Sequence, residues 1–204
     1  MIRTVRTAAL LTTACLGLAA AVPARAETTV VRIRGTIASV EGNAVTIKPR
    51  VGDAILVRLA DGVRIAGASA AKLTDIQPDS YIGTAATPQP DGTLKALEVS
   101  VFAPSMRGTG DGHYPWDLEK ENTMTNGAVG SVTGTTTRTV TVTYAGGQKT
   151  ITVPDDVPVV ALAPADTGLI KPGVRVVAFT RADASGTAVA DRMVVGQNGT
   201  VPPM

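Results

Sequence analysis

The sequence of 204 residues predicts an all-β protein: two tandem small antiparallel β-barrels joined by an ordered linker, after an N-terminal signal peptide. Three observations lead to this prediction. The N-terminus has the pattern of an export signal, a set of sequence blocks occurs twice in the same order, and apolar and polar residues alternate between glycine-containing turns. Aromatic residues make up 3% of the chain, so its cores must be aliphatic, and the many β-branched residues favour strands over helices.

Residues 1–26 have the order of a secretory signal peptide. Arg3 and Arg6 precede an apolar stretch without charges, and Ala24-Arg25-Ala26 places small residues at the two positions that signal peptidase reads. The apolar stretch is too short to span a bilayer comfortably, which argues against an uncleaved anchor. We therefore expect cleavage near Ala26 and a periplasmic or secreted protein, with no transmembrane segment in the mature chain.

Cleavage would change both the charge and the redox chemistry of the chain. Three of the 19 basic residues and none of the 17 acidic ones lie in residues 1–26, so 16 basic residues would face 17 acidic ones. A nucleic-acid partner is therefore not expected, because phosphate binding needs a dense cationic surface. The only cysteine, Cys15, would also be lost, which excludes disulfides, and lipidation there is disfavoured because no leucine lies three positions upstream.

Two stretches of the chain match each other in order and spacing. Both begin with Gly-x-Ile/Val-x-Ser-Val-x-Gly, at residues 35–42 and 127–134. Further blocks follow in the same order: residues 45–47 match 140–142, 55–57 match 151–153, 76–79 match 170–173, and 91–96 match 185–190. An internal repeat of this length indicates duplicated structural units. It predicts barrel domains at residues 27–103 and 125–204, with a linker at residues 104–124.

Each unit alternates with the period of a half-buried strand. Val31, Ile33 and Ile37 share one face of the first predicted strand. Hairpin turns are expected at Gly42-Asn43, Asp61-Gly62, Asp91-Gly92, Gly146-Gly147 and Ser185-Gly186. Only residues 69–76 have a helical pattern. A sheet this small exposes its edges unless it closes, which favours a five- or six-stranded barrel of the oligonucleotide/oligosaccharide-binding (OB-like) shape over an open sandwich.

Three short patterns resemble a known bacterial family. They are the opening Gly-x-Val/Ile-x-Ser-Val-x-Gly, a proline before a buried strand in the middle of each unit, and the closing Gly-Thr-x-x-Ala. Together they resemble the family called domain of unknown function 5666, over both units. The resemblance implies small β-barrel modules of exported proteins, often in tandem, and it implies no particular activity or site residues.

The linker holds the rarest side chains of the sequence: the only histidine, the only tryptophan and one of three tyrosines. A flexible spacer would lack aromatics, so the segment is predicted to be ordered. Its candidate interaction residues are Arg107, His113, Tyr114, Trp116 and Asp117. We expect Tyr114 and Trp116 to pack the linker onto one or both barrels, with Arg107 and Asp117 forming an ion pair. An exposed aromatic platform for a sugar or peptide is the alternative.

A second hypothesis makes the linker a metal site. Its ligands would be Asp111, His113 and Asp117, since imidazole and carboxylate groups suit zinc and similar divalent ions. With one histidine and no cysteine in the mature chain, this is a weak ligand set.

No catalytic constellation is recognisable, and no cofactor is expected. The sequence has no Gly-x-Ser-x-Gly pattern, and Gly108-Thr109-Gly110 follows no strand-to-helix step. We therefore predict a non-catalytic binding or scaffolding protein whose partner is an envelope protein or glycan. The alternative is a periplasmic metal-binding or metal-transport accessory protein.

Overall fold

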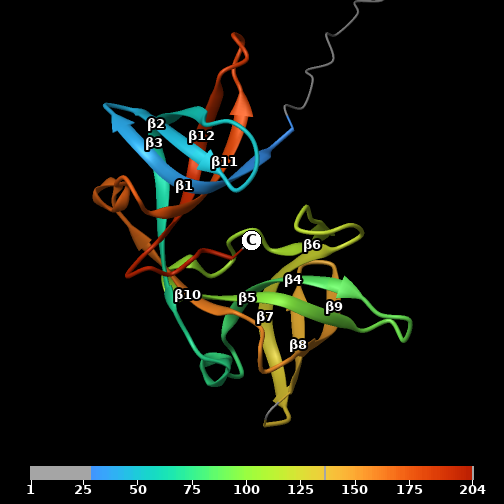
Figure 1. The fold of residues 1–204 in the computed structure, drawn as a ribbon. Coiled ribbons are helices and arrows are strands. Elements are labelled where there is room, and N and C mark those ends of the chain that lie inside the picture. Colours follow the sequence, from blue (N-terminus) through green and yellow to red (C-terminus); the bar gives the residue numbers. More distant parts are fainter. Residues whose placement is uncertain (1–28, 136, 204) are drawn as a thin grey trace, which may run out of the picture.

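The computed structural model of the protein describes residues 29–135 and 137–203, which form strands, turns and three short 3-10 helices, with no α-helix. The predicted signal peptide, its cleavage site and Cys15 lie outside these residues. Two lobes stack on one another, and the C-terminus lies between them (Figure 1). The elements are β1 (Val31–Glu41), β2 (Ala44–Pro49), β3 (Ile55–Ala70), η1 (Leu73–Asp75), β4 (Tyr81–Pro88), β5 (Leu94–Phe102), η2 (Pro104–Met106), β6 (Gly112–Pro115), β7 (Thr123–Thr133), β8 (Arg138–Tyr144), β9 (Gly147–Val153), β10 (Val159–Ala165), η3 (Thr167–Leu169), β11 (Arg175–Ala182) and β12 (Ala188–Gly196).

Five strands form a closed barrel in the upper lobe of Figure 1. β1 pairs antiparallel with β2 and β11, β2 pairs with β3, and β11 pairs with β12. The ring closes where β12 runs parallel to β3, from Ala188 opposite Val57 to Gly196 opposite Ala68. Its interior is aliphatic, as the alternation predicts: Ile33 and Ile37 are buried, while Arg34 between them in β1 stays partly exposed.

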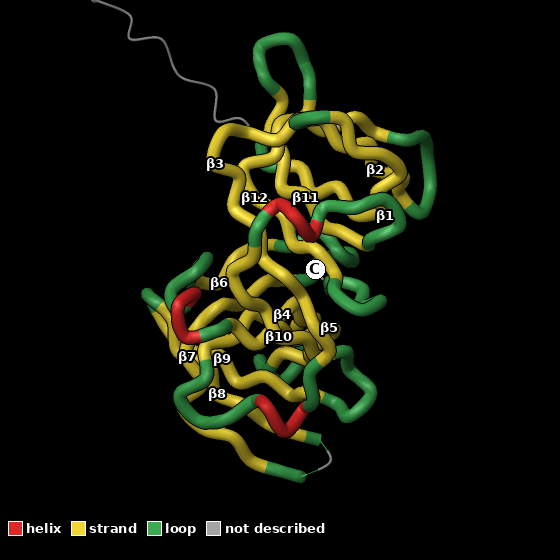
Figure 2. The backbone as a smooth tube through the Cα atoms, turned by 90° about the vertical axis from the view of Figure 1, so that its left-hand side faces the viewer, coloured by secondary structure: helices red, strands yellow, loops and turns green. Residues whose placement is uncertain are grey.

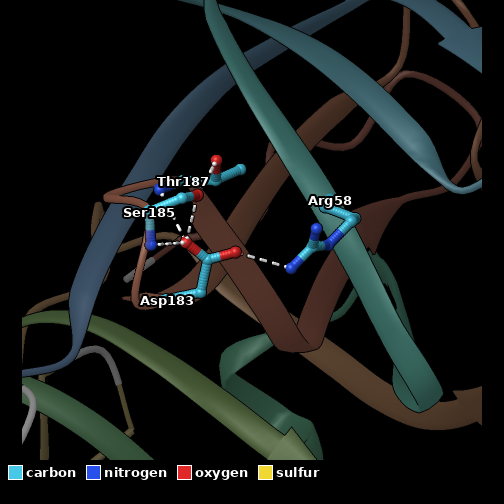
Figure 3. A network of polar contacts seen from close by, with 4 residues as sticks. All are labelled: Arg58, Asp183, Ser185 and Thr187. Carbon is cyan, nitrogen blue, oxygen red and sulfur yellow. Dashed lines mark hydrogen bonds and ion pairs between the residues drawn. The ribbon is translucent and has the colours of Figure 1, made fainter.

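A polar network ties the β11–β12 turn to β3 (Figure 3). Asp183 Oδ1 accepts hydrogen bonds from the Ser185 and Thr187 backbone N–H groups, at 2.9 and 3.0 Å, and from the Ser185 hydroxyl at 2.6 Å. The other carboxylate oxygen pairs with Arg58 Nη2 at 2.6 Å. Because Arg58 belongs to β3, this ion pair crosses the contact that closes the barrel.

The remaining strands form a second set in the lower lobe. β4 pairs antiparallel with β5 and β7, and β8 lies between β7 and β9. β5 meets β9 in parallel only at Leu94 opposite Ile151 and Lys95 opposite Thr152. Two strands extend this set: β6 pairs with β7, and β10 lies between β5 and β3. The sheet therefore continues through β10 from one lobe into the other. Figure 2 shows the two lobes from the side, with β10 labelled in the lower one.

The strand pairings cross the domain boundaries that the sequence predicts. The barrel combines residues 31–70 with residues 175–196, and the second set is built from the strands between them. In Figure 1 the upper lobe accordingly carries blue and red strands, and the lower lobe carries green to orange ones. Boundaries at residues 103 and 125 therefore do not separate the two lobes. Matching blocks identify similar strands, but they cannot indicate which of two similar hairpins completes which set.

Two local predictions differ from the structure. Residues 69–76 are not a helix, because pairing with β10 carries β3 on to Ala70 and leaves only the single turn η1. Asp61-Gly62 is not a hairpin either: it lies inside β3, where residues 60–63 bulge out between the residues that pair with Ala190 and Arg192. Both differences arise from long-range pairing, which overrides the local pattern. Within the described residues no helix has the length and apolar character needed to cross a bilayer.

Apolar side chains from both lobes meet in a central cluster. Its buried members include Ala66 of β3, Phe102 of β5, Leu162 of β10, Phe179 of β11 and Val194 of β12. Barrel and second set each have a separate interior cluster of their own. The lobes are therefore joined by packing as well as by β10, and this junction is where the linker lies.

Candidate functional site

The linker between β5 and β7 is an ordered turn, strand and return. η2 follows β5 directly, and β6 then pairs antiparallel with β7. After β6 the chain turns back, and the Trp116 backbone N–H donates to the Asn122 carbonyl oxygen at 2.9 Å. The buried Asn122 amide, in the orientation that its neighbours require, donates to the carbonyl oxygens of Trp116 and Glu119 at 2.9 Å each. These bonds fix the return loop that carries Trp116.

Tyr114 and Trp116 pack at the junction of the lobes. Their ring centroids are 6.0 Å apart, and both rings are partly buried against the central cluster. The guanidinium of Arg32, from β1, lies 3.6 Å from the centroid of the Trp116 ring, which is a close cation–π contact. Because Arg32 covers one face of the indole, the ring is docked rather than displayed as an open platform.

Asp117 ties the linker to the barrel. Its Oδ1 accepts from Arg34 Nη2 at 2.6 Å, and its Oδ2 lies 3.4 Å from Arg32 Nη1. Partial burial raises the pKa of Asp117, but the hydrogen bond and charge of Arg34, reinforced by Arg32, outweigh it and hold the pKa below its usual value. The predicted pair with Arg107 is wrong: Arg107 Nη2 donates instead to Asp79 Oδ1 at 2.8 Å. Closeness in sequence favoured Arg107, whereas the fold brings β1 against the linker.

Asp111 has a structural role. One of its oxygens accepts from the Tyr81 hydroxyl at 3.1 Å, and the other accepts from the Ala145 backbone N–H at 2.6 Å. Burial raises the pKa of Tyr81 well above its usual value, and the hydrogen bond to Asp111 adds to that shift. Asp111 therefore anchors the linker to β4 and to the β8–β9 turn.

His113 lies on β6 over the second strand set. Its Nδ1 is 2.9 Å from the Thr125 hydroxyl, and its ring stacks on Tyr144 with centroids 6.0 Å apart. Burial and the positive charge of Lys149 lower the pKa of His113, so the neutral ring is favoured.

The proposed metal ligands are not brought together. In residues 29–135 and 137–203, no group of three or more His, Cys, Asp or Glu side chains is placed to hold a metal ion. Asp117 faces two arginines, and Asp111 is occupied by Tyr81 and a backbone amide. The geometry therefore does not supply the ligand set of Asp111, His113 and Asp117.

A cavity of ≈ 50 Å³ lies beside the Tyr114 and Trp116 rings, where the lobes meet. Its apolar wall comes from β3, β5, β10, β11 and β12, and the residues that form it include Ala66, Phe102, Leu162, Phe179 and Val194. Arg192 of β12 and Asn126 of β7 add polar groups to the lining. Both lobes and the linker therefore contribute to one small hollow.

Several polar atoms at this junction lack partners. Trp116 Nε1, Asn126 Oδ1 and the Nε atoms of Arg32 and Arg192 are buried and have no hydrogen-bond partner among the described residues. The Arg192 guanidinium lies 3.9 Å from the centroid of the Phe179 ring. Trp116, Asn126 and Arg192 also line the cavity, and since buried polar atoms are nearly always paired, they mark it as a place for a polar guest.

A wider hollow of ≈ 430 Å³ opens on another part of the junction. Arg34, Arg50, Arg175 and the buried Glu98 line it together with apolar residues and the C-terminal Val201, Pro202 and Pro203. Arg50 and Arg175 are exposed, so water already solvates their charges, and Arg34 is paired with Asp117. The smaller cavity, with its buried unpaired groups, is the better candidate.

Sequence reasoning identifies the aromatic half of this site and misses its cationic half. Alternation places Arg32 on the polar face of β1, which predicts exposure to solvent, but the linker covers that face. Arg192 follows the last matching block, and a single arginine within a strand is too common to indicate a site. β12 comes close to the linker only because the β11–β12 hairpin completes the barrel of residues 31–70, and no local pattern predicts that pairing.

Comparison with family models, with curated proteins and with solved structures gives no match to this chain.

Proposed function

We propose that the protein is an exported, non-catalytic binding protein whose ligand occupies the cavity where the linker meets both lobes. One observation carries the proposal: Trp116, Asn126 and Arg192 each have a buried polar atom without a partner, and they line one hollow together with aromatic and aliphatic side chains. Ligand sites typically combine an apolar wall with a few well-placed polar groups. The ligand would come from the envelope, as a free molecule or as a group carried by an envelope protein or glycan.

The proposal also includes the finer architecture. We infer that the second strand set is a second OB-like barrel, since β4, β5, β7, β8 and β9 pair in the same order as the barrel strands. Gly35 and Gly127 support this inference, because a Cβ at either would overlap the backbone carbonyl oxygen of the neighbouring strand, at Lys48 and at Thr143. Membership of the domain of unknown function 5666 family is part of the same proposal.

A cavity-filling substitution tests the binding function. We expect members of a panel of small organic acids, sugars and amino acids to raise the melting temperature of the protein without residues 1–26. Ala66→Leu should abolish the shift, because Ala66 lines the cavity and is 6% exposed. Ala163→Leu, on the exposed face of β10, is the matched control and should keep it. A panel without any stabilising compound, or shifts that survive Ala66→Leu, would contradict the proposal.

Export is tested separately, by N-terminal sequencing of the protein from a periplasmic fraction. The expected first residue is Glu27. A mature chain that begins at Met1 would contradict export by cleavage.

A further inference from the structure

The unpaired polar atoms at the junction cavity are mostly donors. Among the residues that line the cavity, Trp116 Nε1 and Arg192 Nε can only donate, whereas Asn126 Oδ1 can only accept. A guest that satisfies these two donors must therefore offer oxygen acceptors to both N–H groups. Oxyanions do this best, because hydrogen bonds from arginine to a charged oxygen are among the strongest in proteins.

Arg192 adds a positive charge that no carboxylate of the described residues neutralises through an ion pair. Arg192 forms no ion pair within the part of the chain that the structure describes, and Phe179 lies against its guanidinium. The acid whose charge acts on Arg192 is Asp191, and Asp191 forms its ion pair with Arg181, at 2.7 Å. Burial lowers the pKa of Arg192 and the charge of Arg64 lowers it further, while the charge of Asp191 opposes this shift only in part. A partly buried cation without an ion pair is unfavourable, and a bound anion would offset that cost.

The rest of the cavity limits the size and character of the anion. Ala66, Leu162 and Val194 present an apolar wall opposite the polar groups. A volume of ≈ 50 Å³ accommodates a guest of a few heavy atoms. Large or doubly charged oxyanions do not suit a cavity with a single guanidinium and an apolar wall. A carboxylate on a short alkyl chain does, because its one charge faces the guanidinium and its chain faces the wall.

We propose that the junction cavity binds the carboxylate of a short-chain monocarboxylic acid, with Arg192 and Trp116 as donors and the aliphatic wall around the alkyl chain. This inference rests on the proposed binding function and specifies its ligand class. The carboxylate oxygens would supply the hydrogen-bond acceptors that the N–H groups of Trp116 and Arg192 lack.

Titration with matched acids and amides tests the ligand class. The protein without residues 1–26 is titrated with acetate, propionate and butyrate, and with acetamide, propionamide and butyramide, at constant ionic strength. Trp116, the only tryptophan of the sequence, reports binding through its fluorescence, and the melting temperature provides a second readout. We expect saturable responses to the acids and at least tenfold weaker responses to the amides. Sulfate and chloride arms should give no saturable response.

Arginine variants locate the binding site. Arg192→Met, which keeps the aliphatic bulk but removes the donors, should weaken propionate binding about tenfold or more. Arg64→Met removes a nearby exposed charge outside the cavity and should leave the affinity within about twofold. Circular dichroism and the melting temperature establish that each variant is folded.

The outcomes separate this inference from the proposed function. Amides that bind as well as acids, and lose binding in Ala66→Leu, would overturn the carboxylate assignment and leave the binding function standing. Equal responses to propionate, sulfate and chloride would also overturn it, because they would show a general salt effect. Unchanged propionate affinity in Arg192→Met would overturn the assignment of the donor. The binding function itself fails if no compound of the wider panel binds, or if the shifts survive Ala66→Leu.

Discussion

The barrel and the second strand set differ in the continuity of one strand. In the barrel this strand is β3, and at the matching place in the second set the chain forms two separate strands, β9 and β10. In the barrel, β3 runs without interruption from Ile55 to Ala70 and pairs with β12 on both sides of its bulge at residues 60–63. In the second set, β9 ends at Val153 and the chain resumes as β10 at Val159. β5 accordingly meets β9 at two residue pairs and β10 at four.

Two prolines explain the difference. Pro154 and Pro158 lie between β9 and β10, and proline has no backbone N–H to donate to a ladder. At the matching place in the barrel, Asp61-Gly62 lets β3 bulge and continue. Continuity of this one strand therefore decides how firmly each set closes. Its interruption gives β10 a course of its own, between β5 and β3, where it joins the two lobes.

The largest expected effect concerns a close contact between neighbouring strands that both sets share, at Gly35 in the barrel and at Gly127 in the second set. We expect Gly35→Ala and Gly127→Ala each to lower the free energy of unfolding by about 3–5 kcal/mol, because a Cβ would overlap the neighbouring strand's carbonyl oxygen. Urea unfolding followed by circular dichroism measures the loss. Gly130→Ala, whose Cβ would lie 3.8 Å from the nearest backbone oxygen, is the control and should be close to neutral. A loss in only one set would show that the two are not built alike.

The next effect concerns β10 as the tie between the sets. Leu162 is 2% exposed in the central cluster, so Leu162→Ala should cost about 3 kcal/mol. Because the cluster contains side chains from both lobes, the calorimetric transition should also broaden as the lobes uncouple. Ala163→Ser, at an exposed position of the same strand, should change neither quantity. A sharp transition in Leu162→Ala with unchanged stability would show that the lobes are held together elsewhere.

A smaller loss is expected where the linker docks. Trp116 is partly buried, so Trp116→Ala should cost about 2 kcal/mol rather than the larger value typical of a fully buried ring. Trp116→Phe keeps the packing against Arg32 and should recover most of the stability. Chemical denaturation measures both variants. Native wild-type fluorescence should be blue-shifted, and the emission of a fully solvated indole would contradict the docked arrangement.

The sequence predicts the strands of this fold better than their partners. Alternation locates β1 and β8 because the period of a half-buried strand is a local property, and Ile33, Ile37, Val140 and Val142 are buried as expected. The pairing of β11 with β1 joins residues about 140 positions apart, as in Arg175 opposite Thr36, and no local pattern encodes it. The same limit explains the site: Trp116 stands out by its rarity, whereas Arg32 and Arg192 matter only because the pairing brings them to it.

The smallest effect compares the two hairpin turns, which share a backbone pattern but differ in side chains. In both, the first turn residue, Asp183 or Gln89, donates its N–H to a carbonyl oxygen four residues on, at Thr187 or Thr93. In the barrel turn, hydrogen bonds from Ser185 and Thr187 and the charge of Arg58 lower the pKa of Asp183 to about 2. Gln89 carries no charge, and its side-chain amide donates to the carbonyl oxygens of neighbouring residues. The carboxylate of the other turn is that of Asp91, which accepts hydrogen bonds from Thr93 and has no arginine partner among the described residues.

The lowered pKa of Asp183 determines the direction in which the stability of the fold depends on pH. Between its ordinary pKa and about 2, the unfolded chain holds a proton on Asp183 that the folded chain does not, so this contribution is complete above about pH 4 and is lost as the pH falls towards 2. The melting temperature of wild type should therefore fall more steeply between pH 4 and pH 2 than that of Asp183→Asn. Gln89→Ala, at the matching place in the other turn, should follow wild type. Parallel acid titration curves for wild type and Asp183→Asn would show that the carboxylate does not hold the barrel turn to β3, and that closure depends on the β3–β12 ladder alone.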